Sequence, residues 1–229
     1  MGHCYSEDAD DAKKCRVDGA TEDCQKNWLA SSLSRCHSAP HKRNKRLQDP
    51  GNDCSHEVMT TMSEEIFDVV DDADRVVRQE RRSVVHSENL LHRAVSIFVL
   101  KPDGRMLLQL RSDSKDQYPG CYTSSASGHV DSGEDYETAA IRELSEELSL
   151  DSPIEYLAKF PAGPDTAFEF SALYQLVTDA EPVLDPDEIA SAEFLPLEEI
   201  ASMVDESPEK FTPPFRVMFR WFCDNRSTS

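Results

Sequence analysis

The chain has 229 residues, a formal net charge of −20 and 38% hydrophobic residues. This length is enough for one well-buried domain and an additional segment. No apolar run approaches the roughly 18 residues that a membrane-spanning helix needs. The first residues also lack the basic region and apolar core of a secretory signal. We therefore expect a cytoplasmic protein with no membrane partner.

The charge is unevenly distributed along the chain. Residues 1–61 contain ten acidic and nine basic residues, whereas residues 62–229 contain 34 acidic and 15 basic ones and carry a net charge of −19. Such a surface repels the phosphates of nucleic acids. We expect no polynucleotide partner, and an anionic small-molecule substrate would need a bridging metal.

The first 57 residues differ in composition from the rest. They hold five of the seven cysteines at irregular spacing, without the Cys-x-x-Cys pairs of a zinc module. A basic cluster at 41–46 is either a solvated patch or an interaction tail. We predict that residues 1–60 are disordered, or are an extension upstream of a true start at Met59 or Met62. Residues 61–226 are expected to form the domain.

Strand and helix patterns interleave along this domain. Apolar runs separated by turn residues such as Pro102-Asp103-Gly104 predict β-strands, and apolar residues at helical spacing predict helices. The expected strands are 66–70, 75–77, 93–100, 105–110, 154–160, 168–177 and 193–195. Helices are expected from residue 135 onward, over 197–204 and over 215–223. This order predicts a mixed α/β domain.

The first of these helices carries an unusual concentration of acids. Glu143, Glu146 and Glu147 stand at i, i+3 and i+4 and share one side of the helix. Like charges at these spacings cost about 0.2–0.5 kcal/mol per pair in an isolated helix. A hard divalent cation such as Mg²⁺ or Mn²⁺ would offset that repulsion, because such ions take oxygen ligands. The alternative is an acidic, solvated helix face.

The spacing of the surrounding residues favours the metal site. Gly128, Glu134 and then the run from Arg142 to Glu147 follow the pattern Gly-x₅-Glu-x₇-Arg-Glu-apolar-x-Glu-Glu-x-Gly-apolar. This stretch resembles the Nudix box, with Ser149 in place of its last glycine. The resemblance implies an α/β/α sandwich with a mixed central sheet. Ser149 is expected to adopt the left-handed helix cap at some energetic cost.

The resemblance also implies roles for the residues of the box. Nudix hydrolases cleave a diphosphate linkage, typically in a nucleoside diphosphate joined to another group, with a metal-activated water. By position, the expected catalytic residues are Glu143, Glu147 and Arg142. The expected metal ligands are Glu146, Glu147, Glu143, Glu134 and the carbonyl of Ser127. A carboxylate outside the box, Glu169 or Glu188, is a candidate to assist.

Sequence outside the box, over about residues 63–224, is similar to the Nudix branch that contains isopentenyl-diphosphate isomerase. That enzyme needs a cysteine immediately before the Gly-His pair, where this chain has Ser127. A hydroxyl is a far poorer acid than a thiol, so isomerisation is the alternative to hydrolysis. The resemblance implies that His129 and His92 bind metal together with Glu169, and His86 is a further candidate ligand. His86 and His92 are six residues apart, whereas the isomerases have seven.

The sequence does not identify the substrate beyond a small diphosphate compound, and it leaves the oligomeric state open. Aromatic residues in the loops and the last helix are candidates to stack on a base: Tyr118, Tyr122, Phe168 and Trp221. Four basic residues are candidates to contact phosphates: Lys101, Arg105, Arg111 and Lys115. Cys121 is interpreted as a small buried residue and not as a replacement for the missing thiol.

Overall fold

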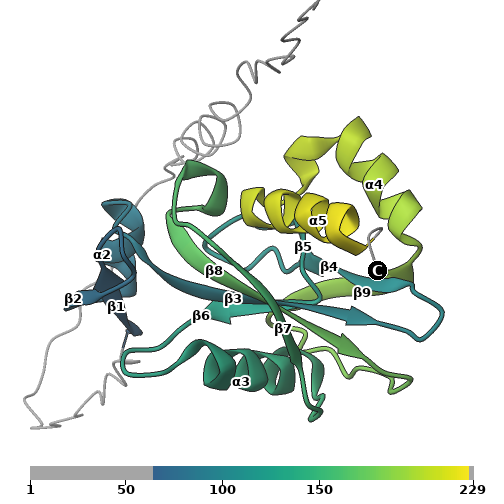
Figure 1. Ribbon diagram of the computed structural model, residues 1–229, viewed down its shortest axis with the longest axis horizontal. Helices are drawn as coiled ribbons and strands as arrows, with labels where there is room; N and C mark the ends of the chain where they lie inside the picture. Colours follow the sequence, from purple (N-terminus) through teal and green to yellow (C-terminus); the bar gives the residue numbers. More distant parts are fainter. Residues whose placement is uncertain (1–63, 227–229) are drawn as a thin grey trace, which may run out of the picture. The chain divides into compact units, whose positions relative to one another are not determined.

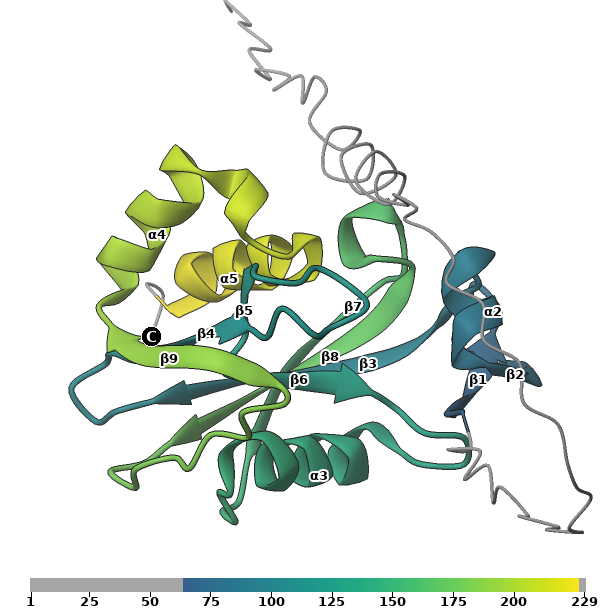
Figure 2. The ribbon, with the colours of Figure 1, turned by 180° about the vertical axis from the view of Figure 1, so that it is seen from behind.

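The computed structural model describes residues 64–226. The prediction for residues 1–60 lies outside this range, so the expected domain boundary at residue 61 stays a prediction. The described part consists of a mixed β-sheet with helix α3 (Tyr136–Leu148) on one face. Helices α4 (Leu197–Glu206) and α5 (Pro213–Arg226) cover the other face (Figures 1 and 2). The predicted α/β/α sandwich is confirmed.

The central sheet has seven strands. Five of them lie in the order β5-β4-β3-β8-β7, while β6 also pairs with β3 and β9 also pairs with β4. Only the β3–β8 pair is parallel among the described strands, which makes the sheet mixed. The strands are β3 (His92–Leu100), β4 (Met106–Arg111), β5 (Tyr122–Thr123), β6 (Ala126–His129), β7 (Glu155–Phe160), β8 (Glu169–Val177) and β9 (Ile189–Leu195).

Two hydrophobic cores lie on opposite faces of this sheet, because successive strand residues point in opposite directions. Val95, Ile97 and Val99 of β3 pack with Leu144 and the other apolar residues of α3. Their neighbours in the strand pack with α4 and α5; these are Phe98 and Leu100. β3 is therefore buried on both faces, as its continuous apolar run predicts.

The sheet divides between β3 and β4. These two strands pair at one recorded position, Leu100 with Met106. Beyond it, β6 takes the free edge of β3, while β4 pairs with β5 and β9. The Ser125 hydroxyl joins the two branches, because it accepts from the Val99 amide at 2.8 Å and donates to the Leu107 carbonyl at 2.6 Å. The division leaves space between β6 and β4.

The ends of α3 follow from its sequence. Asp135 caps the first turn by accepting a hydrogen bond from the Thr138 amide at 2.8 Å. At the other end Ser149 adopts the left-handed conformation with φ 52°, and the amide of Leu150 donates to the carbonyl of Leu144. The predicted cap at Ser149 is confirmed.

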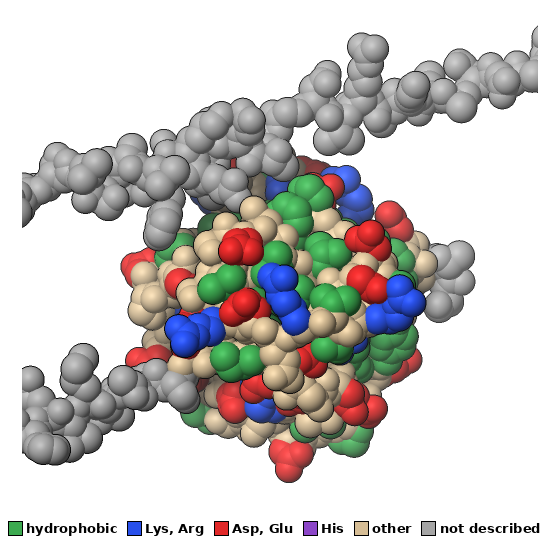
Figure 3. Space-filling model, turned by 90° about the vertical axis from the view of Figure 1, so that its left-hand side faces the viewer, with side chains coloured by type: hydrophobic (Ala, Val, Ile, Leu, Met, Phe, Trp, Pro, Cys, Tyr) green, Lys and Arg blue, Asp and Glu red, His purple; other side chains and the backbone are tan. Residues whose placement is uncertain are grey.

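A second, two-stranded sheet precedes the central one. It pairs β1 (Ile66–Val70) with β2 (Val76–Arg81), and the short helix α2 (Arg82–Ser87) follows directly. The predicted hairpin is confirmed, but its second strand is longer than expected, and the sequence analysis did not predict α2. Figure 3 faces this end of the molecule; acidic, basic and hydrophobic side chains are interspersed on it, so this face has no uniform charge.

The hairpin is fixed to the central sheet and to α3 through Asp74. Its carboxylate accepts from Arg93 at 2.6 Å, from Lys159 at 2.6 Å and from the Tyr136 hydroxyl at 3.0 Å. Because this side chain is mostly buried, the three partners offset the cost of removing its charge from water. The hairpin and α2 are thereby held beside the first residues of β3.

The remaining predicted elements are close to those observed. β9 begins four residues earlier than expected, and α4 and α5 each extend beyond the predicted ends. Glu169 is the first residue of β8. Among residues 64–226, no helix has the length and apolar character needed to cross a bilayer.

Candidate functional site

A cavity of about 440 Å³ opens at the division of the sheet. Its wall combines residues of β3, β6, α3 and the start of β8 with the 111–118 loop. Charged side chains dominate this wall, and they include Arg111, Lys115, Arg142, Glu143, Glu146, Glu147, Glu169 and Glu188. A binding cavity with this lining suits an anionic ligand held by cations.

Glu147 is the most deeply buried acid of the helix, with 3% of its surface exposed. Its Oε2 accepts from Gln109 Nε2 at 3.0 Å and from the Ser127 amide at 3.3 Å. Burial, reinforced by the charges of Glu143 and Glu188, raises the pKa of Glu147 to about 8. A divalent cation would reverse this shift, so the environment fits a metal ligand.

Glu143 lies directly against Gly128. A Cβ atom at position 128 would be 2.0 Å from Glu143 Oε1, so only glycine leaves room for this carboxylate. Burial raises the pKa of Glu143 to about 7, although Arg142 Nη1 at 2.6 Å favours its ionised form. A carboxylate with this pKa is able to accept a proton near neutral pH.

Arg142 connects several groups around the cavity. Its guanidinium contacts both oxygens of Glu134, at 3.1 and 2.9 Å, and reaches Glu146 at 3.1 Å. It also donates to the main-chain carbonyl of His129 at 3.0 Å. Glu146 is 60% exposed, in contrast to Glu147. Arg142 therefore offsets the repulsion among the acids of the box and fixes the backbone beside Gly128.

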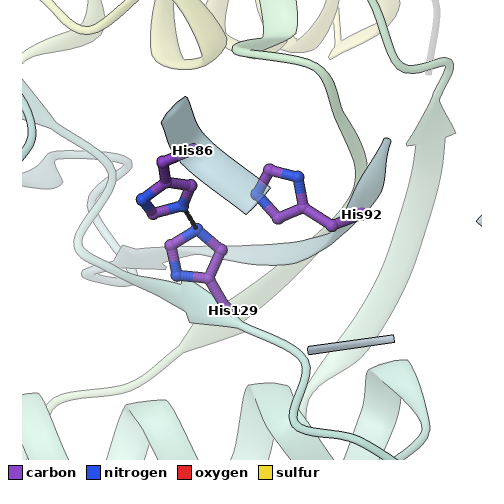
Figure 4. A group of neighbouring side chains, drawn as sticks. All are labelled: His86, His92 and His129. Carbon is purple, nitrogen blue, oxygen red and sulfur yellow. Dashed lines mark hydrogen bonds between the residues drawn. The ribbon is translucent and has the colours of Figure 1, made fainter. Parts of the chain in front are cut away.

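Three histidines meet next to the cavity. His86 of α2, His92 of β3 and His129 of β6 each offer a ring nitrogen, and these nitrogens all lie within 4.8 Å of one another. Figure 4 shows the three rings pointing toward a common centre, with the hydrogen bond between His86 Nε2 and His129 Nε2 at 3.2 Å. Glu169 Oε1 is 3.3 Å from His129 Nε2 and 3.7 Å from His92 Nε2.

The environment keeps these imidazoles neutral. Burial lowers the pKa of His86 and of His92 to about 4, and that of His129 to about 3. His92 uses Nδ1 to contact the Leu90 carbonyl at 2.8 Å, and its buried Nε2 has no hydrogen-bond partner within the described structure. Neutral imidazoles with a free ring nitrogen fit the donor set of a metal ion.

Comparison with known proteins identifies the family. A family model described as the NUDIX domain matches residues 90–222, more than half of the chain. The chain belongs to the Nudix family.

Individual relatives show which members of the Nudix family this Nudix protein is similar to. It is 32% identical over 162 residues to the isopentenyl-diphosphate Delta-isomerase of Serratia proteamaculans, which covers 69% of this chain and 90% of the relative. It is 32% identical over 151 residues to the prenyl-diphosphate phosphatase of Methanosarcina mazei, covering 64% of this chain and 88% of the relative. The solved structure of DR0079 from Deinococcus radiodurans superimposes with a TM-score of 0.62 at 29% identity, covering 68% of this chain and 98% of that one.

These similarities support the predicted family and its isomerase-like branch, and they identify this Nudix protein as a hydrolase acting on diphosphate bonds.

The geometry shows which predicted site residues come together. Glu143, Glu146 and Glu147 of the box line the cavity. Glu134 does not line it but pairs with Arg142, which does. Ser127 lies beside Glu147, and Glu169 lies beside His129. Glu188 also lines the cavity, where its carboxylate pairs with Lys115.

Only some of the candidate phosphate-binding and base-stacking residues of the Nudix protein line the cavity. Lys101 is held by the carbonyls of 179 and 180 and by Glu181, and Arg105 pairs with Asp103. Of the four proposed phosphate contacts, Arg111 and Lys115 line the cavity. Of the four aromatic candidates, only Tyr118 does so, while Trp221 packs edge-on against Phe160. Cys121 is not among the lining residues.

Gln109 and Arg82 are among the residues of this site that sequence reasoning missed. Gln109 lies in an apolar strand, and its contact with Glu147 spans 38 positions of the chain. Arg82 lines the cavity from α2 and is paired with Glu65 and Asp116, both at 2.8 Å. Neither has a motif that would have revealed it, because both depend on contacts between distant segments.

Proposed function

We propose that the protein is a metal-dependent hydrolase that cleaves a diphosphate linkage in a small phosphorylated substrate. The observation that carries this proposal is Glu147, a buried carboxylate that accepts from the Ser127 amide in a cavity that is also lined by Glu143, Arg111 and Lys115. Mg²⁺ or Mn²⁺ would be held chiefly by Glu146 and Glu147, which leaves Glu143, the other expected ligand of the box, to act as the base. Glu134 and the carbonyl of Ser127 are further candidate ligands.

The reaction follows from what the residues can do. A bound Mg²⁺ or Mn²⁺ acidifies water and neutralises charge on phosphate oxygens. Glu143, with its raised pKa, accepts a proton from the attacking water. The water oxygen bonds to phosphorus while the bridging P–O bond breaks, and the leaving phosphate takes the bond electrons. Arg142 holds the Glu143 carboxylate in place, and Arg111 and Lys115 supply positive charge for the substrate phosphates.

The substrate class is the second part of the proposal. We infer a nucleoside-diphosphate-type compound or a prenyl diphosphate, since one relative is named as a prenyl-diphosphate phosphatase. Among the described residues, Tyr118 is the one of the four aromatic candidates that lines the cavity, and it is the candidate for stacking on a base. The expected cytoplasmic location stays a prediction.

A second candidate function, double-bond isomerisation of isopentenyl diphosphate, has one observation in its favour. The three histidines and Glu169 that the isomerase resemblance implies are brought together, and His86 joins them despite its altered spacing. We propose that this group binds a second cation. Ser127 still argues against isomerisation, because its hydroxyl cannot replace the acidity of a thiol.

The test is phosphate release from a panel of nucleoside diphosphates, sugar nucleotides, dinucleotides, prenyl diphosphates and isopentenyl diphosphate, with Mg²⁺ or Mn²⁺. We expect at least one compound to be cleaved, and Glu147→Gln to lower kcat at least hundredfold, about 2.7 kcal/mol of barrier. Glu137→Gln is the matched control, because it changes an exposed glutamate of the same helix. Retention of activity within tenfold by Glu147→Gln would remove Glu147 from the mechanism. Conversion of isopentenyl diphosphate to its isomer without any hydrolysis would establish the second candidate.

A further inference from the structure

The hydrogen bonds of Glu147 are distributed unevenly between its two oxygens. Gln109 Nε2 and the Ser127 amide both donate to Oε2. Oε1 receives neither of these bonds. Because two donors on one oxygen fix the plane and the direction of the carboxylate, Oε1 is left in a defined position for another partner.

The two donors come from different branches of the divided sheet. Ser127 belongs to β6, which pairs with β3, whereas Gln109 belongs to β4, which pairs with β5 and β9 on the other side of the division. The Glu147 side chain extends from α3 to the division of the sheet, where it accepts one hydrogen bond from each branch. The position of its carboxylate therefore depends on Gln109 as much as on the residues of its own helix.

The buried environment of Gln109 destabilises the folded protein, which is unexpected for a residue whose only role is packing. Its side chain is 1% exposed, and its amide oxygen has no hydrogen-bond partner within the described structure. An unsatisfied buried acceptor destabilises the folded state. An apolar side chain of similar length would pack at this position without that cost.

We propose that Gln109 is a positioning residue that directs Oε1 of Glu147 toward the catalytic metal. The inference rests on the proposed function and deepens it by assigning a residue outside the Nudix box to the metal site. The amide hydrogen bond restrains the carboxylate before the ion arrives, so less ordering is required when the ion binds. Groups that orient metal ligands in this way typically change metal affinity by about 10–100-fold when they are removed.

The decisive variant is Gln109→Met, which removes the donor and keeps the length of the side chain. We expect its Mg²⁺ dissociation constant, measured by isothermal titration calorimetry, to rise about tenfold. Its melting temperature should stay close to that of the wild type, because removal of the unsatisfied amide oxygen offsets the loss of the hydrogen bond to Glu147. Mg²⁺ is the chosen probe, since this hard cation prefers carboxylates to the imidazoles of the histidine group.

Gln175→Met is the matched control. Gln175 is also a strand glutamine that donates to a glutamate, Glu155 at 2.6 Å, but Glu155, unlike Glu147, is not among the residues that line the cavity. We expect its Mg²⁺ affinity to match the wild type. The proposal is overturned if Gln109→Met binds Mg²⁺ within twofold of the wild type, or if its affinity falls only in parallel with a lowered melting temperature, as in a purely structural role.

Calorimetry also separates this inference from the proposed function. If the wild type cleaves no compound of the panel while Gln109→Met still weakens Mg²⁺ binding, the hydrolase proposal fails and the role of Gln109 stands. If substrates are cleaved and Mg²⁺ affinity is unchanged in Gln109→Met, the hydrolase stands and Gln109 has no positioning role. Glu147→Gln serves as the reference for loss of the negative charge of this ligand.

Discussion

At the scale of single residues, Gly128 shows how tightly the site is built. Its φ angle does not require glycine, but a Cβ atom would lie 2.0 Å from Glu143 Oε1 and 2.1 Å from the carboxyl carbon. The glycine of the box is therefore needed for the close approach of a catalytic carboxylate and not for a turn. The Glu143 side chain would have to move to accommodate any other residue.

Gly128→Ala should consequently lower kcat by about two orders of magnitude, roughly 2.7 kcal/mol of barrier, because a misplaced base loses its alignment. Steady-state kinetics on the substrate found in the panel measures this effect. Gly163→Ala provides the comparison, since a Cβ there meets nothing within 4 Å. Equal activity of the two variants would show that Glu143 needs no fixed position.

At the scale of elements, α3 combines a strong beginning with a weak end. Asp135 and the Thr138 amide form a favourable N-cap, whereas Ser149 occupies a left-handed conformation that most residues avoid. The Nudix box has glycine at this position. The serine thus costs stability at the C-terminal end of the helix that carries the acids.

Replacing this residue by glycine should relieve the strain. We expect Ser149→Gly to raise the free energy of unfolding by about 0.5–1 kcal/mol, measured by urea denaturation. Ser145→Gly, within the same helix, should lower it by a similar amount because glycine disfavours helix interiors. A loss of stability in Ser149→Gly would mean that the serine side chain makes a favourable interaction at the cap.

The short helix α2 illustrates why some elements escaped prediction. Its six residues, RSVVHS, include two β-branched valines and no capping side-chain hydrogen bond. Such a sequence is a poor helix in isolation. Burial of Val85 against Phe67 and Val69 of the hairpin stabilises it, and this packing also brings His86 to the other histidines.

At the scale of the whole molecule, the site makes stability depend on pH and metal. Glu143, Glu147 and Glu169 have pKa values raised to about 7, 8 and 7, so between pH 4.5 and these values the folded protein holds more protons than the unfolded chain. Their contribution to stability falls as pH rises through that window. The three histidines act oppositely, but only below their ordinary pKa of about 6.5.

Above pH 6.5, among the described residues with shifted pKa values, these three carboxylates set the slope of stability against pH. We expect the melting temperature of the metal-free protein to fall between pH 6.5 and 8, and Mg²⁺ or Mn²⁺ to remove this decrease by stabilising the ionised acids. Differential scanning fluorimetry with chelator and with metal measures both conditions. Glu147→Gln should flatten the metal-free slope, and a rising melting temperature in the presence of chelator would contradict the assignment.

Local sequence determined much of the fold and of the carboxylate half of the site. The spacing from Gly128 to Ser149 depends on contacts within a strand, a loop and one helix, so it predicted α3, its cap and the residues lining the cavity. The apolar run of β3 likewise predicted a strand buried on both faces, because periodicity records burial directly.

The tertiary structure decided the rest. The meeting of His86, His92 and His129, the division of the sheet and the bond from Gln109 to Glu147 all join segments that are distant in the chain. A six-residue spacing between two histidines does not specify whether their rings converge, because the intervening helix and strand set the directions of both side chains. Pairing between distant segments leaves no period in the sequence. The resemblance implied a group of histidines, but only the folded chain showed that His86 joins it, where the sheet divides and that Gln109 contacts Glu147.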